Sequence, residues 1–392
     1  MRVMNLALDA FEFGLHTHIY YGVNKLNELP SIIRKYGYNK VFICSDKGIV
    51  QSGGLQRLEA LLSEAGVAFY SCTEVEPDPT IEMVQRAKNL YVEHRCDALI
   101  GMGGGSSIDT AKGVSVAAAN PGDLSQYEGK DKIPNKGPDV ITIPTTAGTG
   151  SEVTHATVLK DSKRHYKMGI LSAHLHARAA VLDPQLLTTV PRGVAAVTGM
   201  DALSHAIESY TSNQAQPITE AFGLYAIRLI GRHLRPFAAR RADLTAACHM
   251  MLASTMAGAA FIWGRIAAVH AISHPLGGRL GVAHGLANSL LLPVVMRYNV
   301  GTNYEKFRDI AVALGENVEG LSLRAAAERS ITAVELLIRD LEIPTTLSAL
   351  DLKPSDEELN VIAQEAMDSG MTSANPKDCT VKDLRAMLEQ IR

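Results

Sequence analysis

The stretch DALIGMGGGSSIDTAKG, residues 97–113, decides the fold of the first half of the chain. It opens as an apolar run typical of a buried strand, turns at three consecutive glycines and continues in a helical pattern. Glycine lets the backbone approach phosphate oxygens closely, and the first N–H groups of the helix then face the anion. A tight turn alone would also use glycine, but the context favours a phosphate-binding loop made by Gly103, Gly104, Gly105 and Ser106.

Outward from this stretch, short apolar runs alternate with amphipathic helical patterns, which is typical of a parallel sheet covered by helices. Helical periodicity marks 53–65 and 81–94, and 157–171 is typical of a β-hairpin with its polar turn at 161–164. We place Asp109 in the first turn of the helix after the glycines, where a carboxylate favours the helix dipole. The strands are expected at 40–44, 67–72, 98–102, 140–143 and 180–182.

From about Pro191 the strand signals stop and helical patterns fill the rest of the chain. Ser322 and Thr380 can cap two of these helices with their hydroxyls. At 392 residues the chain exceeds the size that one core usually reaches, so we predict an α/β domain over 1–188, an all-helical domain over 189–392 and a cleft between them. The helices are expected at 193–211, 217–234, 243–262, 264–276, 284–298, 303–314, 322–341, 355–369 and 380–391.

Composition limits the classes of partner. The net charge is −3, and the nearest approach to a basic run, 231–241, is typical of a solvated helix face rather than a nucleic-acid or membrane footprint. Five widely spaced cysteines without a CxxC motif fit free thiols in a reducing cytosol. No basic and apolar leader opens the sequence, and no apolar run reaches the roughly 18 residues of a membrane span. We expect a soluble, cytoplasmic protein that binds neither nucleic acid nor membranes.

Asp201, His205, His270 and His284 form a set of four metal-capable side chains in the apolar second half. Asp201 and His205 are one helical turn apart and so leave the same face of a helix. His270 and His274 form a second such pair, and His284 follows a Pro-Leu-Gly-Gly break that would let the chain reverse toward the same point. A single histidine is more often a core residue, but three imidazoles and one carboxylate together suit iron or zinc better than calcium or magnesium.

Two further stretches suit a dinucleotide. ITIPTTAGTGSEVTHATVL, residues 141–159, follows a strand and offers small hydroxyls for a pyrophosphate or a ribose, although a cluster of β-turns would explain part of this composition. Asp46 ends the strand in VFICSDKG, where it can accept ribose hydroxyls and repel a 2′-phosphate, which favours NAD over NADP. An ordinary helix-capping role explains Asp46 equally well.

Taken together, these segments resemble the iron-containing, or group III, alcohol dehydrogenase family over essentially the whole chain. The stretches GGGSSIDTAK, PTTAGTGSEVT, GMDALSHAIESY and HAISHPLGG followed by AHGLAN occur in the order found in that family. The resemblance implies a Rossmann-like α/β domain and an all-α C-terminal domain, the dehydroquinate synthase-like architecture. It also implies NAD(P) and a divalent metal, usually iron.

The resemblance also implies roles for single residues. The metal ligands of that family correspond to Asp201, His205, His270 and His284 in this chain. His274 matches a family histidine that lies near the nicotinamide and is not a ligand. Lys167 matches a lysine that reaches the cofactor ribose, and Asp46 the residue that selects NAD. The remaining cofactor contacts fall on Gly103, Gly104, Gly105, Ser106, Asp109, Thr145, Thr146, Thr149 and Ser151.

Substrate contacts are expected around the segment FIWGRIAAVH. Phe261 matches a family position that flanks the substrate, and His155 and Ala156 are further candidates for the pocket wall. Arg265 departs from the Gly or Ser that the family often has there, and near a metal it can clamp an anionic tail. The alternative for Arg265 is an interface or surface arginine.

We therefore expect a metal-dependent, NAD(H)-linked alcohol dehydrogenase or aldehyde reductase that acts on a short-chain primary alcohol or aldehyde. If Arg265 clamps an anion, the substrate carries a polar or anionic tail. His274 is the candidate for moving the proton, because an imidazole titrates near neutral pH, although a packing role is the alternative. A metal-dependent lyase or synthase of the dehydroquinate synthase and glycerol dehydrogenase superfamily stays open, as does a non-catalytic NAD-binding protein. We expect a homodimer or a higher homo-oligomer.

Overall fold

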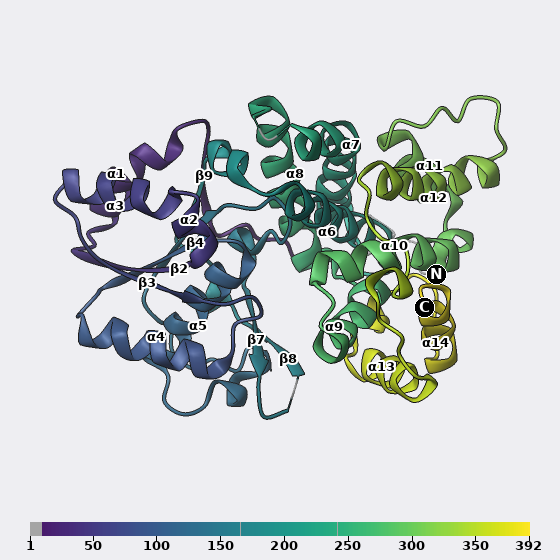
Figure 1. Cartoon of the computed structure of the whole chain (residues 1–392). Coiled ribbons are helices and arrows are strands. Elements are labelled where there is room, and N and C mark those ends of the chain that lie inside the picture. Colours follow the sequence, from purple (N-terminus) through teal and green to yellow (C-terminus); the bar gives the residue numbers. More distant parts are fainter. Residues whose placement is uncertain (1–9, 165, 241) are drawn as a thin grey trace. The chain divides into compact units, whose positions relative to one another are not determined.

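The computed structural model describes residues 10–164, 166–240 and 242–392, which divide into two compact units (Figure 1). The α/β unit is Leu15–Val190, and the helical unit is Pro191–Arg392 together with the described residues before Leu15. In the helical unit the indole Nε1 of Trp263 donates to the backbone oxygen of Gly14 at 2.9 Å, and the Phe13 ring lies 5.7 Å from that of Phe222. Residues 10–14 therefore pack with the helices, although the sequence places them in the first domain.

Among the described residues, six parallel strands form the main sheet of the α/β unit, in the order β1-β9-β6-β4-β2-β3. All five strands expected from the apolar runs are present, with small differences at their ends. The four-residue strand β1 was not predicted, because its pairing with β9 is distant in sequence and leaves no local pattern. The strands are β1 (His18–Tyr21), β2 (Lys40–Asp46), β3 (Ala68–Val75), β4 (Ala98–Gly103), β6 (Val140–Pro144) and β9 (Ala179–Leu182).

Helices cover both faces of this sheet, with α1 (Leu29–Tyr36) and α3 (Gly54–Glu64) on one face and α4 (Ile81–Glu93) and α5 (Gly105–Ala119) on the other (Figure 1). Along β2, Val41 and Ile43 pack into the hydrophobic core on the side of α1 and α3. Phe42 and Cys44 pack into the core on the side of α4 and α5. This alternation follows from the two-residue period of a strand. The α/β class predicted for this unit is confirmed.

The expected hairpin is also present. Strand β7 (Ala156–Asp161) pairs antiparallel with β8 (Tyr166–Leu171), and the short strand β5 (Gly129–Lys130) runs parallel to β8. Asp161 shapes the polar turn, because its Oδ1 accepts from the backbone N–H groups of Lys163 at 2.9 Å and Arg164 at 3.1 Å.

Helices make up the second unit, as predicted, and the hydroxyls of Ser322 and Thr380 cap two of them by accepting from Ala325 N and Asp383 N. Helix α8 is long and apolar enough to cross a membrane by length and composition alone, but 67% of that window is buried, as in a core helix. The helices are α6 (Arg192–Thr211), α7 (Pro217–Ala239), α8 (Leu244–Gly264), α9 (Ala268–Leu280), α10 (His284–Asn299), α11 (Tyr304–Ala313), α12 (Leu323–Asp340), α13 (Asp356–Asp368) and α14 (Val381–Gln390).

One expectation about the backbone is wrong. The Pro-Leu-Gly-Gly segment does not break the chain, because α9 continues through Pro275 to Leu280. A proline removes one N–H group but has a φ close to the helical value, so the surrounding packing can keep it inside a helix. The helix ends instead at Gly281, whose left-handed φ of 69° is the usual stop signal. The chain then reverses over three residues before His284 opens α10.

Candidate metal centre and cofactor loops

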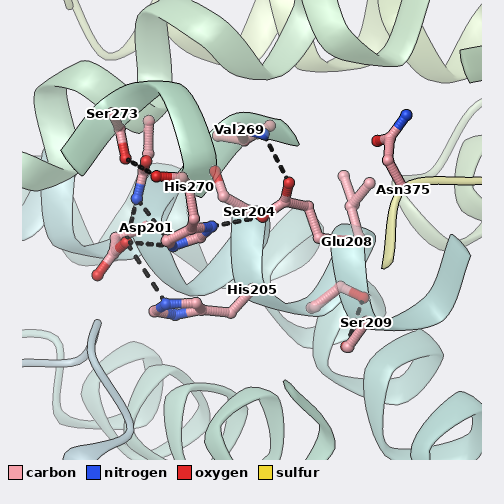
Figure 2. A network of polar contacts seen from close by, with 12 residues as sticks. Asp201, Ser204, His205, Glu208, Ser209, Val269, His270, Ser273 and Asn375 are labelled. Carbon is pink, nitrogen blue, oxygen red and sulfur yellow. Dashed lines mark hydrogen bonds and ion pairs between the residues drawn. The ribbon is translucent and has the colours of Figure 1, made fainter. Parts of the chain in front are cut away.

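Four side chains of the helical unit form a group that can hold a metal ion. Figure 2 shows three of them, Asp201, His205 and His270. Asp201 and His205 lie on α6, His270 on α9, and His284 opens α10. One ligand atom from each lies within 4.8 Å of the others. Oδ1 of Asp201 is 3.8 Å from Nε2 of His205, 3.8 Å from that of His270 and 3.5 Å from that of His284. The structure thus brings together the four side chains that the sequence analysis named as metal ligands.

The donor set and its spacing fit a transition metal. Four atoms about 2.1 Å from one ion stand roughly 3.4 Å apart in a tetrahedral site, close to the distances from Asp201 Oδ1. Burial raises the pKa of the Asp201 carboxyl, but His205, His284 and His270 outweigh it and hold that pKa well below its usual range. The buried group is therefore an ionised carboxylate among imidazoles, which suits iron and zinc alike.

Glu208 supports this group, although the sequence reading did not single it out. Its Oε1 accepts from Val269 N at 2.7 Å, and its Oε2 makes a very short contact with Nδ1 of His270 (Figure 2). Burial lowers the pKa of His270, but Glu208 and Asp201 raise it to about 9. Glu208 stands seven residues after Asp201, two turns along α6, and that spacing was the available signal. A carboxylate on the second ring nitrogen fixes the orientation of a ligating histidine.

Two other residues expected near the metal, His274 and Phe261, lie close to this group. The ring of His274, one turn after His270 on α9, is 6.1 Å from the His270 ring and 5.3 Å from that of His284, and it falls outside the group of four. The ring of Phe261 stacks on that of His205, with centroids 4.4 Å apart. Helix α8 thus supplies an aromatic wall beside one ligand.

Arg265 ends α8 in an unusual backbone conformation. Its φ of 70° and ψ of 152° fall near a region that only glycine normally occupies. Its side chain is exposed, and it forms no ion pair with any carboxylate in the part of the chain that the structure describes. The strain lies four residues after Phe261 and five before His270, within the segment that flanks the metal group.

In the α/β unit, the glycine loop and the second loop lie against each other because β4 and β6 are neighbours. Gly104 caps α5 without a side chain, so no side chain blocks the N–H groups of its first turn. A Cβ on Gly105 would lie 2.9 Å from Cγ2 of Thr149, and one on Gly104 3.5 Å from Oγ1 of Thr146. Oγ1 of Thr145 is buried and has no hydrogen-bond partner among the described residues. A glycine cradle, an open helix N-terminus and an unpaired hydroxyl together fit a phosphate-bearing ligand.

Three cofactor candidates have partners within the protein. Asp46 caps the short helix α2 (Lys47–Gln51), since its Oδ1 accepts from Gly48 N at 2.8 Å and from Ile49 N at 3.1 Å. Its Oδ2 accepts from the hydroxyl of Ser107 at 3.2 Å, which keeps it beside the glycine loop. Nζ of Lys167 forms an ion pair with Asp78 at 2.6 Å. The third candidate, Asp109, differs more from expectation.

Asp109 does not lie in the first turn of α5, contrary to expectation, because the helix begins at Gly105 and Asp109 is its fifth residue. The carboxylate is buried, and it accepts from Ser151 Oγ at 2.6 Å and from Val158 N at 3.0 Å. Burial raises its pKa, while the neighbouring Lys112 lowers it. Asp109 therefore ties α5 to the second loop and to β7.

Lys112 is a further residue that the sequence reading missed. Its Nζ is fully buried and donates to the backbone oxygens of Ser151 at 2.7 Å, Thr154 at 2.8 Å and Ala156 at 3.0 Å. Burial lowers the pKa of this lysine to about 8. A lysine three residues after Asp109 on a predicted helix was the only signal in the sequence. It holds the backbone of the second loop, directly before His155, whose ring lies 5.0 Å from that of His176.

A loop built for phosphates and a buried group of three histidines and one aspartate, carried on one chain, define a metal-dependent oxidoreductase that uses a dinucleotide. Residues 16–184 match the family model for iron-containing alcohol dehydrogenase, and residues 195–392 match the C-terminal model of the same family. The chain belongs to the iron-containing alcohol dehydrogenase family. This membership confirms the expected class, a metal-dependent, NAD-linked oxidoreductase acting on alcohols or aldehydes.

Individual relatives agree with this assignment. The NAD-dependent methanol dehydrogenase of Bacillus methanolicus is 36% identical, over 94% of this chain and 96% of that protein. The crystal structure of a 1,3-propanediol oxidoreductase matches with a TM-score of 0.95 and 36% identity, covering 98% of this chain and all of that one. Sulfoacetaldehyde reductase from Bifidobacterium kashiwanohense, solved in complex with NAD⁺, matches with a TM-score of 0.88 and 28% identity, over 98% of this chain and 99% of that one. The predicted two-part fold is thereby confirmed.

Proposed function

We propose that the chain interconverts a short-chain primary alcohol and its aldehyde by hydride transfer to and from NAD, with a metal ion held by Asp201, His205, His270 and His284. The observation that carries this proposal is the buried group of four ligand atoms within 4.8 Å of one another. When bound, the ion supplies Lewis acidity, which polarises a substrate oxygen. Iron is the first candidate because of the family, and zinc suits the same donors.

For the cofactor, we propose that the first turn of α5 binds the pyrophosphate through the backbone of Gly103, Gly104, Gly105 and Ser106. The unpaired hydroxyl of Thr145 supports this role. Thr146, Thr149 and Ser151 would line the second loop, whose backbone Lys112 and Asp109 hold in place. Lys167 and Asp46 would reach the riboses, and a carboxylate at Asp46 favours NAD over NADP.

His274 is proposed to move the proton between substrate and solvent. Its ring stands beside the ligands without belonging to their group. An imidazole nitrogen can accept the proton that an alcohol loses and return it in the reverse direction. A residue that only packs there would leave the pH profile of kcat unchanged when replaced.

For the substrate, we propose that Phe261 and His155 flank the reacting end, and that Arg265 binds a polar or anionic tail. The backbone of Arg265 is held in a conformation that costs about 1–3 kcal/mol, which points to a functional demand on that position. Since the Arg265 guanidinium has no carboxylate partner among the described residues, it is available for an external anion. Among the similar structures, one is by its title a reductase of sulfoacetaldehyde, an aldehyde with a sulfonate tail.

We further propose that residues 1–188 act as the cofactor domain and 189–392 as the metal domain, in a cytoplasmic homodimer or higher homo-oligomer. The five cysteines, all free thiols, support a reducing compartment. Size-exclusion chromatography with light scattering would measure the oligomeric state.

The test of the function is a panel of alcohols and aldehydes followed at the NADH absorbance band, with iron or zinc returned to metal-stripped protein. We expect turnover that depends on the added ion and on NAD(H). Turnover of a substrate without net change in NADH would contradict the proposal and favour the lyase or synthase alternative. In the same panel, equal losses of kcat/KM for anionic and neutral aldehydes in Arg265→Ala would contradict the role given to the arginine.

A further inference from the structure

The side-chain amide of Asn288 contacts three of the four ligand atoms. Its Nδ2 donates to Oδ1 of Asp201 at 2.7 Å and lies 3.1 Å from Nε2 of His270 and 3.2 Å from Nε2 of His284. Asn288 is fully buried on α10, one turn after His284, so both side chains leave the same face of that helix. The amide therefore covers the face that these three ligand atoms form.

The two ends of this amide are in unequal surroundings. The nitrogen end, which can only donate, donates to a carboxylate oxygen of Asp201 and lies beside Nε2 of His270 and of His284, the atoms proposed to bind the metal. The oxygen end is buried and has no hydrogen-bond partner among the described residues. Leaving a buried acceptor unpaired costs about 1–3 kcal/mol, so packing alone does not explain an asparagine at this position.

A second buried asparagine on the same helix, Asn299, has hydrogen-bond partners at both ends of its amide. Nδ2 of Asn299 donates to Oδ1 of Asn375 at 2.9 Å, and Nδ2 of Asn375 donates back to Oδ1 of Asn299 at 2.8 Å. Both ends of the Asn299 side chain are thus satisfied by another asparagine, as expected for a structural polar pair. Among the described residues Asn288 has no such pair, and its amide nitrogen contacts only metal-ligand candidates.

We propose that Asn288 is a positioning residue of the metal centre. Its Nδ2 donates to the carboxylate of Asp201 and fixes its orientation, and the amide packs against the rings of His270 and His284. Glu208 fixes His270 through the other ring nitrogen, so this imidazole is held from both sides. The inference rests on the proposed function for the identity of the ligands, and adds a residue outside the ligand set that governs how well they bind the ion.

The test uses the full-length chain stripped of metal and the variant Asn288→Leu, which keeps the side-chain volume close and removes the donor. The dissociation constants of Zn²⁺ and Co²⁺ are measured by competition with a chromophoric chelator, without NAD or substrate. We expect about 10–100-fold weaker binding in the variant, the usual effect of losing a partner of a ligand. The visible absorption of bound Co²⁺, which reports coordination geometry, should also change.

The matched control is Asn299→Leu, which removes a buried amide from the same helix and should leave both dissociation constants and the Co²⁺ spectrum as in the wild type. If Asn288→Leu does not fold, as judged by circular dichroism, Asn288→Ala replaces it under the same criterion. Unchanged affinity in the folded variant would overturn the proposal. Tighter binding would also overturn it, because the amide would then compete with the ion for the ligands.

These outcomes are distinct from a failure of the proposed function. A wild-type chain that binds neither ion would overturn the metal centre itself and Asn288's role with it. Tight binding by the wild type that Asn288→Leu leaves unaltered would overturn the role of Asn288 alone.

Discussion

The metal centre is formed by side chains, whereas the proposed cofactor loops act through their backbone. The metal centre consists of side chains on regular helices, separated by four residues on α6, with Glu208 a further turn along the same face. The cofactor loops work through backbone N–H groups and glycines, and they depend on contacts between segments about 40 residues apart, such as Lys112 with Ser151. Substitutions in the first region should therefore change metal binding, and substitutions in the second should change cofactor binding without affecting the metal.

The largest expected effect is in the metal centre. Replacing His270 or His284 with Ala removes one of four ligands, and we expect metal retention and turnover to fall by more than 100-fold, beyond the effect of losing a ligand's partner. NADH binding should survive, because the cofactor loops belong to the other unit. Elemental analysis and NADH fluorescence titration measure the two effects, and a fully loaded, active variant would contradict the ligand assignment.

The next effect tests the cofactor loops. In Gly105→Ala the new Cβ meets Cγ2 of Thr149 at 2.9 Å, so the two loops must separate. We expect NADH binding to weaken about tenfold, equivalent to roughly 1.4 kcal/mol, with metal content unchanged. Adding Thr149→Ser removes the clashing methyl group and should restore most of the affinity. A loss of metal in Gly105→Ala would show that the two regions are not independent.

A smaller effect concerns acid stability. Burial, with help from His155, His16 and Lys112, lowers the pKa of His176 to about 3, below its ordinary value of 6.5. Between pH 6.5 and 3 the His176 side chain is therefore protonated in the unfolded chain but neutral in the folded unit. The free energy of unfolding falls as the pH drops through this range. His176→Asn should lower the midpoint of acid unfolding of the α/β unit. An unchanged midpoint would contradict a neutral, partly buried His176.

The smallest effect is a gain in stability. Arg265→Gly removes the strain of a positive φ, and we expect a gain of about 1 kcal/mol in the free energy of unfolding. Arg265→Ala removes the same guanidinium but keeps a Cβ in the strained conformation, so it should gain nothing. Chemical denaturation compares the two variants. Equal stabilities would show that the backbone there is not strained.

The same contrast explains what the sequence predicted. The ligands were predictable because helical spacing places Asp201 beside His205, and the strands because apolar runs mark them. The burial of Asp109 was not predictable, because it depends on where α5 begins, whereas the helix cap formed by Asp46 was one of the two roles expected for it. For Asn288 and Lys112 the sequence offered only a helical spacing from His284 and from Asp109. Their roles depend on contacts that form on folding. The continuation of α9 through Pro275 depends on packing that a local pattern does not encode.

The central claim is that one ion, held by four side chains, makes this chain an alcohol dehydrogenase. It is tested most directly by anomalous X-ray diffraction from crystals of the iron- or zinc-loaded protein, collected on both sides of the metal edge. We expect a single strong peak about 2.0–2.2 Å from ligand atoms of Asp201, His205, His270 and His284. A peak elsewhere, or none in protein that reduces NAD with an alcohol, would contradict the account.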